Sequence, residues 1–179
     1  MIDTQTEING SGSEADSVTV KDLLDVTERI MDLDERRQEA LRTDIESDTD
    51  GFVETRDVLE EQRQELARLE RYLSAERDHL SELVEGTDHL SVNQAVRHRD
   101  QSIEKIREHN ETLSRFHEEM DGLLAVVETN LERIETEGED ADLEDSREHL
   151  EAAIDAIRDH NDSIDGLDTN LRILQAYLG

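Results

Sequence analysis

Apolar residues recur at alternating three- and four-residue steps along most of this chain. A stripe with this spacing lines one face of an α-helix, and its repetition over several heptads is typical of coiled coils. One stretch keeps a single heptad phase from Val92 to Ile134. We therefore expect an all-α protein, an elongated antiparallel coiled coil or helical bundle of three to four long helices. Another series stands seven residues apart: Phe52, Leu59, Leu66, Leu73 and Leu80.

Runs of weak helix formers divide this pattern into segments. Residues 1–17 are rich in glycine, serine and acidic residues and lack the apolar period, so we expect a disordered tail there. The remaining residues, 18–179, are expected to form one helical coiled-coil domain. Its predicted helices cover about 19–47, 52–85, 91–137 and 142–178.

The junction at Asp48–Gly51 leaves two arrangements open. Its residues favour a break or kink, although the heptad phase continues across it. A turn would fold the first helix back and complete a four-helix bundle. A continuous helix would leave an apolar stripe without a partner, suited to an oligomer or a docked helix. The candidate interface residues on this stripe are Val20, Leu23, Leu24, Ile30, Met31 and Leu33.

Antiparallel pairing predicts which seam residues meet in the last two helices. A hairpin folded near residue 139 places Leu124 opposite Ile154 and Met120 opposite Ile157. Polar seam residues are costly unless they hydrogen-bond to each other. The same register matches them: His117 meets Asn161, and Asn110 meets Asp168.

A hairpin folded near residue 88 extends the argument to the second and third helices. Leu80 is then opposite Val96, and Glu76 meets Arg99 as an ion pair. Such a pair adds little net stability but disfavours slipped registers. The polar residues expected to set the register are therefore Glu76, Arg99, Asn110, Asp168, His117 and Asn161.

An internal repeat relates residues 106–113 to residues 157–164, and both copies contain an Ile-Arg-acid-His-Asn run. The repeat favours duplication of one helical unit. A metal site built on the repeated His109 and His160 is one interpretation. The predicted register, however, separates them by about a heptad, roughly 10 Å along the axis. We therefore expect them to flank the seam, and we expect no metal ligand.

The acidity of the chain has three interpretations. Asp and Glu number 49 against 19 Lys and Arg, a formal net charge of -30. Acidic tails and nucleic-acid mimics concentrate charge in blocks, whereas here it is spread over almost every turn. Only Lys21 and Lys105 are lysines. Adaptation to molar intracellular salt is favoured, and the composition resembles that of proteins from salt-accumulating halophilic archaea.

Several classes of function are disfavoured. The chain has no cysteine, and it shows neither a glycine-rich phosphate loop nor a strand-turn-helix nucleophile motif. No basic helix precedes the leucine series, so direct nucleic-acid binding is not expected. No signal peptide or transmembrane stretch is recognised, which favours a cytoplasmic protein without membrane insertion.

These observations favour a non-catalytic scaffold or interaction protein of a halophile. It would act by self-association, as a homo-oligomer, or by docking the helix of a protein partner, without a cofactor or catalytic residues. One alternative is a carboxylate/His metal-binding bundle with an oxidoreductase or storage role. Another is an acidic, chaperone-like binder of basic proteins.

Overall fold

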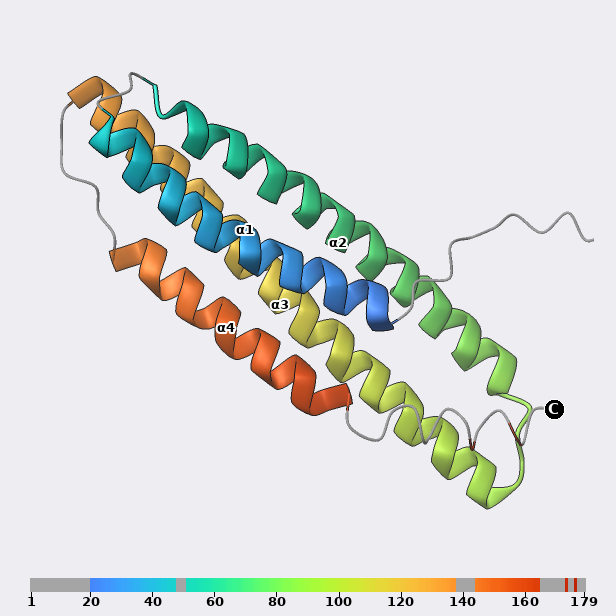
Figure 1. Ribbon diagram of the computed structural model, residues 1–179. Helices are drawn as coiled ribbons and strands as arrows, with labels where there is room; N and C mark the ends of the chain where they lie inside the picture. Colours follow the sequence, from blue (N-terminus) through green and yellow to red (C-terminus); the bar gives the residue numbers. More distant parts are fainter. Residues whose placement is uncertain (1–19, 48–50, 138–143, 165–172, 174–175, 177–179) are drawn as a thin grey trace, which may run out of the picture.

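The computed structural model describes residues 20–47, 51–137, 144–164, 173 and 176 (Figure 1). The part of the chain described is all-helical, as predicted, and forms no strand. The expected tail, residues 1–17, and most of the chain after Ile164 lie outside the described residues. The four helices are α1 (Val20–Glu46), α2 (Val53–Thr87), α3 (Asn93–Glu137) and α4 (Glu144–Ile164).

The helices form an elongated antiparallel bundle in which sequence neighbours are also neighbours in space. The main contacts join α1 to α2, α2 to α3, and α3 to α4. In the view of Figure 1, α1 lies between α2 and α4 and in front of α3. This is the up-down-up-down order that short connections favour.

All four helices contribute to one apolar core. The stripes that the heptad pattern predicts face inward, because burying each large aliphatic side chain contributes about 1.5–3 kcal/mol. The most deeply buried large side chains are mainly leucines of α1, α2 and α3, whereas α4 contributes mainly alanines. The core residues are Leu23, Val26, Ile30, Phe52, Leu59, Leu66, Leu69, Leu73, Leu113, Phe116, Met120, Leu123, Leu124, Leu131, Ala153 and Ala156.

The chain turns between α1 and α2, which resolves the junction that the sequence left open. Gly51 and Phe52 both have positive φ, 90° and 47° respectively. Glycine adopts this left-handed region readily, but phenylalanine does so only where packing compensates. Phe52 is buried in the core immediately before α2 begins. Phe52 therefore keeps the heptad spacing because it packs into the core after a turn. The alternative of one continuous helix across this junction is wrong.

Folding back also covers the stripe proposed as an interface. Leu23, Ile30 and Leu33 are at most 1% exposed, and Met31 packs against the core from a partly buried position. The side chains of Val20 and Leu24 lie outside the described residues. The described part of this stripe is therefore core, and the interpretation that it is an open docking surface is wrong.

The pairing of α2 with α3 differs from the predicted register by about two heptads. Arg63 contacts Glu128, and Arg56 contacts Glu135, whereas the prediction places Arg63 opposite residue 112 or 113. An arginine side chain cannot span that difference, about 22 Å at 1.5 Å per residue. The prediction assumed that pairing starts at the connection. In Figure 1, α3 instead runs on past the end of α2.

The pairing of α3 with α4 is shifted by about one heptad. Glu119 contacts His149, whereas the predicted register places it opposite residue 158 or 159. Ile154, which was expected in the seam, is 39% exposed, and Ala153 and Ala156 are fully buried in its place. The prediction was wrong because it chose the larger apolar residues. The buried face of α4 therefore combines small alanines with the partly buried Leu150 and Ile157.

Candidate functional site

Buried polar side chains mark the positions that apolar packing alone does not explain. Each must find a partner or carry a desolvation cost of about 1–3 kcal/mol. In the first hairpin they are Thr27, Asp34, Arg37, Asp44, Thr55, Gln62 and Thr87. In α3 and α4 they are Ser102, His109, Asn110, Asn130 and His160.

Asp44 of α1 caps the first turn of α2. The residue at the N-cap position, Phe52, provides no side-chain cap. The Asp44 carboxylate instead accepts hydrogen bonds from the Thr55 backbone N–H at 2.9 Å and from its hydroxyl at 2.8 Å. A negative charge at a helix N-terminus is also favoured by the helix dipole. Residue 44 therefore fixes where α2 starts relative to α1.

A buried ion pair lies about two to three turns earlier in α1. Arg37 donates to the Asp34 carboxylate and, at 3.4 Å, to the side-chain oxygen of Gln62 in α2. Gln62 in turn donates to the Ile30 carbonyl at 3.3 Å. Burial lowers the pKa of Arg37 and the adjacent Asp34 carboxylate opposes that shift, so the guanidinium remains charged. The result is a connected polar network between α1 and α2.

Two imidazoles meet between α3 and α4. The ring centroids of His109 and His160 are 4.3 Å apart with an interplanar angle of 43°, and the residues are 3% and 0% exposed. Burial lowers the pKa of both rings to about 4, and His109 further opposes a charge on His160. Both rings are therefore neutral at pH 7. The predicted separation of one heptad is wrong, because α4 is shifted by about one heptad against α3, which brings the two histidines into contact.

A second histidine of α4 packs against a glycine of α3. His149 Nδ1 lies 2.8 Å from a carboxylate oxygen of Glu119. A Cβ added at Gly122 would lie only 2.7 Å from Cε1 of the same ring. Because real Cβ contacts are essentially never that short, the His149 ring would have to shift if residue 122 had a side chain.

The structure does not bring Glu76 and Arg99 together. Arg99 pairs with Asp100 at 2.8 Å and donates to the Thr87 carbonyl at 3.4 Å. Glu76 lies 3.9 Å from His79 on its own helix, and burial raises the pKa of its carboxyl. The predicted interhelical ion pair therefore fails with the register from which it was inferred.

For each of the other two predicted polar pairs, the structure describes only one of the two side chains. Asn110 is buried at 6% exposure, and its amide nitrogen and oxygen have no hydrogen-bond partner in the described part of the chain. His117 is half-buried. Their expected partners, Asp168 and the side chain of Asn161, lie outside the described residues. The shifted register moves Asn161 away from His117, because the neighbouring His160 contacts His109. The pairing of Asn110 with Asp168 stays a prediction.

The prediction from the sequence missed the polar residues that join α1 to α2, although the sequence contains a signal for them. Leu23, Ile30, Arg37 and Asp44 stand seven apart, so two polar residues continue an apolar series. Gln62 likewise lies seven residues before Leu69. Polar residues at seam positions in the first two helices should have been paired with each other.

The described residues contain no group of three or more histidine, cysteine or acidic side chains placed to hold a metal ion. An open hollow on the surface is lined only by polar and charged residues of α3, Gln101 and Glu104 among them. None of the four described helices has an apolar stretch suited to crossing a bilayer. Among the polar side chains described above, Asp44, Arg37 and Gln62 join α1 to α2, and His149 joins α4 to α3.

A comparison with protein-family models, curated proteins and solved structures finds no match for this chain.

Proposed function

We propose that this protein is a non-catalytic coiled-coil scaffold that acts by self-association or by docking the helix of a partner. One observation carries the proposal: buried polar side chains of the first hairpin form a network of hydrogen bonds that joins α1 to α2. Asp44 contacts Thr55, and Arg37 contacts Asp34 and Gln62. Such contacts specify one arrangement of a long rod, which is the property that a scaffold requires.

The exposed apolar side chains suggest where an association should be tested. Ile45 and Val53 are 61% and 53% exposed, and they flank the turn between α1 and α2. Val92, in the connection before α3, is 58% exposed. Single exposed apolar residues are normal in monomers, so their contribution has to be measured.

Light scattering on the full chain in molar KCl tests the proposal. We expect a discrete oligomer, and we expect Ile45→Glu combined with Val53→Glu to weaken it if the turn is the contact. Val92→Glu is the matched control at the opposite end of the rod. A monodisperse monomer at every concentration, together with failure to recover a partner from the native host at native salt, would exclude both forms of the proposal.

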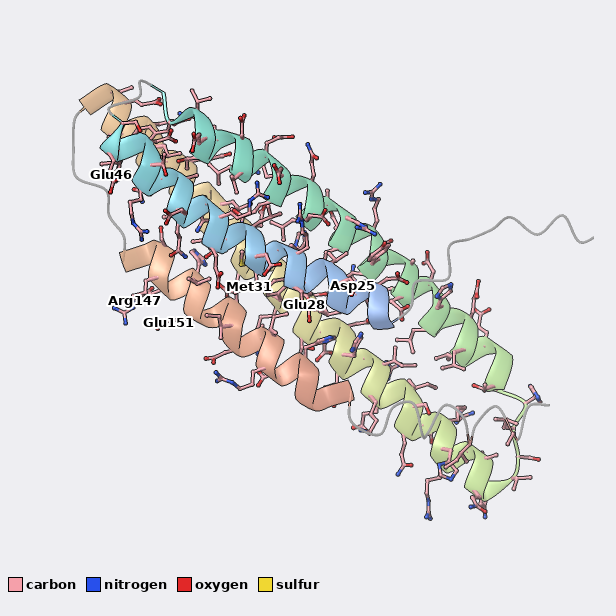
Figure 2. All side chains as sticks on the ribbon, viewed as in Figure 1. Asp25, Glu28, Met31, Glu46, Arg147 and Glu151 are labelled. Carbon is pink, nitrogen blue, oxygen red and sulfur yellow. The ribbon has the colours of Figure 1, made fainter. Side chains whose placement is uncertain are left out.

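We further propose that the protein works in a cytoplasm of molar salt. Exposed acidic side chains lie along the helices, as Asp25, Glu28 and Glu46 do on α1 and Glu151 does on α4 (Figure 2). At molar salt the Debye length is about 3 Å, so repulsion within a chain of net charge -30 is largely screened. Thermal unfolding followed by circular dichroism should shift upward from low to molar KCl. An unchanged melting curve would contradict salt adaptation.

The metal-binding alternative is supported by one observation, the contact between His109 and His160. It remains the second candidate because a divalent cation there would have two neutral ligands and no described carboxylate to balance its charge. Metal analysis of the purified protein decides between the two. One equivalent of bound metal that is lost in His160→Ala and kept in His79→Ala would favour this alternative.

A further inference from the structure

At one end of the rod, α2 and α3 extend past α1 and past the described part of α4 (Figure 1). The contact of Asp44 with Thr55 sets a register in which α1 begins opposite about residue 79 of α2. The contact of His109 with His160 sets one in which the described α4 ends opposite about residue 105 of α3. The last turns of α2 and the first three turns of α3 therefore lie beyond both helices.

The stripe of α3 that faces α4 nevertheless stays buried at this end. Its residues stand seven apart, and its member His109 contacts His160. Two other members, Ala95 and Ser102, lie beyond the described α4 but are only 1% and 0% exposed. This burial indicates that a further segment lies over the first turns of α3. The stripe consists of Ala95, Ser102, His109, Phe116 and Leu123.

Where α4 is described, this stripe combines a large residue of α3 with a small residue of α4. One heptad from the histidine pair, the register places Phe116 opposite Ala153, and both are 0% exposed. One heptad further, Leu123 lies opposite Ser146, whose hydroxyl oxygen is buried. The small residues of α4 thus leave room for the large side chains of α3.

The internal repeat predicts the reverse combination on the other side of the histidine pair. At the offset of 51 residues that relates the two histidines, Leu167 is the equivalent of Phe116, and Ala153 is the equivalent of Ser102. An antiparallel pair of equivalent helices has an approximate two-fold axis, so a contact on one side of the axis is repeated on the other. The layer of Phe116 with Ala153 therefore predicts a layer of Leu167 with Ser102.

A second layer follows from the same symmetry. Leu174 is the equivalent of Leu123, and Ala95 is the equivalent of Ser146. The layer of Leu123 with Ser146 therefore predicts that Leu174 lies over Ala95. In both predicted layers the small residue is on α3 and the leucine is on the segment that follows α4.

This segment, residues 165–179, has the length to reach the end of the rod. Because α4 is antiparallel to α3, a continuation of α4 points toward the first residue of α3. In a helix, 15 residues span about 22 Å, and the first 12 residues of α3 span about 18 Å. The two positions described in this segment, Ile173 and Ala176, are helical. Its leucines recur at helical steps of four, three and four residues: Leu167, Leu171, Leu174 and Leu178.

We propose that residues 165–179 dock as a continuation of α4 on the first turns of α3, where Leu167 covers Ser102 and Leu174 covers Ala95. The segment thereby closes this end of the rod to a second copy or a partner helix, which has to displace it before docking. Its attachment to α4 gives it a roughly millimolar effective concentration at this face, so a free helix competes poorly. The proposal concerns contacts within one chain and is independent of the proposed scaffold role.

Disulfide formation tests the predicted layers, because the chain has no cysteine. Ser102→Cys with Leu167→Cys should form a disulfide within one chain under mild oxidation in molar KCl. The matched control is Ser102→Cys with Thr169→Cys, which lies two residues further on the opposite helix face and should react about tenfold more slowly or less. A disulfide that forms only between two chains would show that a second copy covers this face and would overturn the proposal.

A third cysteine pair tests the register. The proposal places Asp168 opposite about residue 101 of α3, whereas the pairing expected from the sequence places it at Asn110. The two arrangements exclude each other. Efficient disulfide formation within the chain by Asn110→Cys with Asp168→Cys would therefore also overturn the proposal.

Thiol labelling of the chain with Ser102→Cys gives a second measurement. Adding Leu174→Asp should raise the labelling rate by about tenfold or more, because a carboxylate is unfavourable in an apolar contact. Ala176→Asp, at an exposed position of the same segment, should leave the rate unchanged. Ala153→Cys, buried elsewhere on α4, should stay protected in the Leu174→Asp background, and Leu174→Ala replaces that change if it does not. A labelling rate that neither change at residue 174 raises would contradict the proposal.

Discussion

The two hairpins of this bundle are built from different contacts. Between α1 and α2, buried polar groups are paired: Asp44 caps α2 through Thr55, and Arg37 joins Asp34 to Gln62. Between α3 and α4, small residues and neutral imidazoles meet instead. Ala153 and Ala156 are fully buried there. Buried charge and hydrogen bonding specify the first hairpin, whereas small buried residues and uncharged rings fill much of the second.

This difference has an energetic consequence. Removing one member of a buried charged network leaves the other uncompensated, which costs about 3–5 kcal/mol. Adding a single methyl group at a close helix contact costs about 1–3 kcal/mol, because neighbouring side chains must shift. We therefore expect single substitutions to damage the first hairpin more than the second.

The largest effect is expected from Asp34→Leu. Loss of the carboxylate leaves the buried guanidinium of Arg37 without its counter-ion, and unfolding by denaturant in molar KCl should show a loss of about 3–5 kcal/mol. Asp34→Leu combined with Arg37→Leu should recover most of that loss. The matched control is Glu39→Ala, which breaks an exposed pair of the same spacing with Arg42 and should cost less than about 0.5 kcal/mol. Equal losses for the two pairs would contradict the comparison.

A smaller effect is expected from Asp44→Ala. The Thr55 N–H and hydroxyl lose their shared acceptor, and the first turn of α2 loses its cap, at a cost of about 1–3 kcal/mol in the free energy of unfolding. Asp44→Asn keeps an acceptor oxygen and should cost less. Asp57→Ala, at an exposed position in the second turn of α2, is the control. If Asp44→Ala and Asp57→Ala are equally stable, the cap between helices contributes nothing.

In the second hairpin, Gly122→Ala should destabilise by about 1–2 kcal/mol, because the new Cβ collides with the His149 ring and the gain in helix propensity offsets only part of this. Gly86→Ala near the end of α2 has no atom within 4 Å of its new Cβ, so it should be neutral or stabilising by up to about 1 kcal/mol. In a His149→Ala background, Gly122→Ala should become neutral or stabilising as well. A destabilisation that persists without the imidazole would show that the close approach lies elsewhere.

The smallest effect is expected from Arg115→Ala. Its ion pair with Asp159 joins α3 to α4, but both side chains are about half exposed. Such pairs contribute about 0–1 kcal/mol, and molar salt screens most of that. We expect a measurable loss of stability only at reduced salt, where the variant has to be compared with wild type under identical conditions. A loss above about 1 kcal/mol in molar KCl would show that the second hairpin also depends on charge.

The fold could be predicted from the sequence because heptad spacing is a local property. Leu59, Leu66 and Leu73 lie on one face of a helix wherever that helix is placed, so the number of helices and their inward faces follow from the chain alone. The acidic surface is equally independent of the register. The polar contacts of α1 and α2 were accessible in principle, since Arg37 and Asp44 interrupt an apolar series.

Register could not be predicted in the same way, because many alignments of two heptad stripes bury similar apolar area. Whether α3 extends past α2 depends on the path of the connection. Whether Ala153 or Ile154 faces α3 depends on how α4 is rotated against α3, which is a property of contacts between the two helices such as that of His149 with Glu119. Periodicity by itself therefore determined the helices, their amphipathic faces and the charge of the surface. The tertiary structure alone decided that α1 folds back and that His109 meets His160, because both depend on groups far apart in the chain.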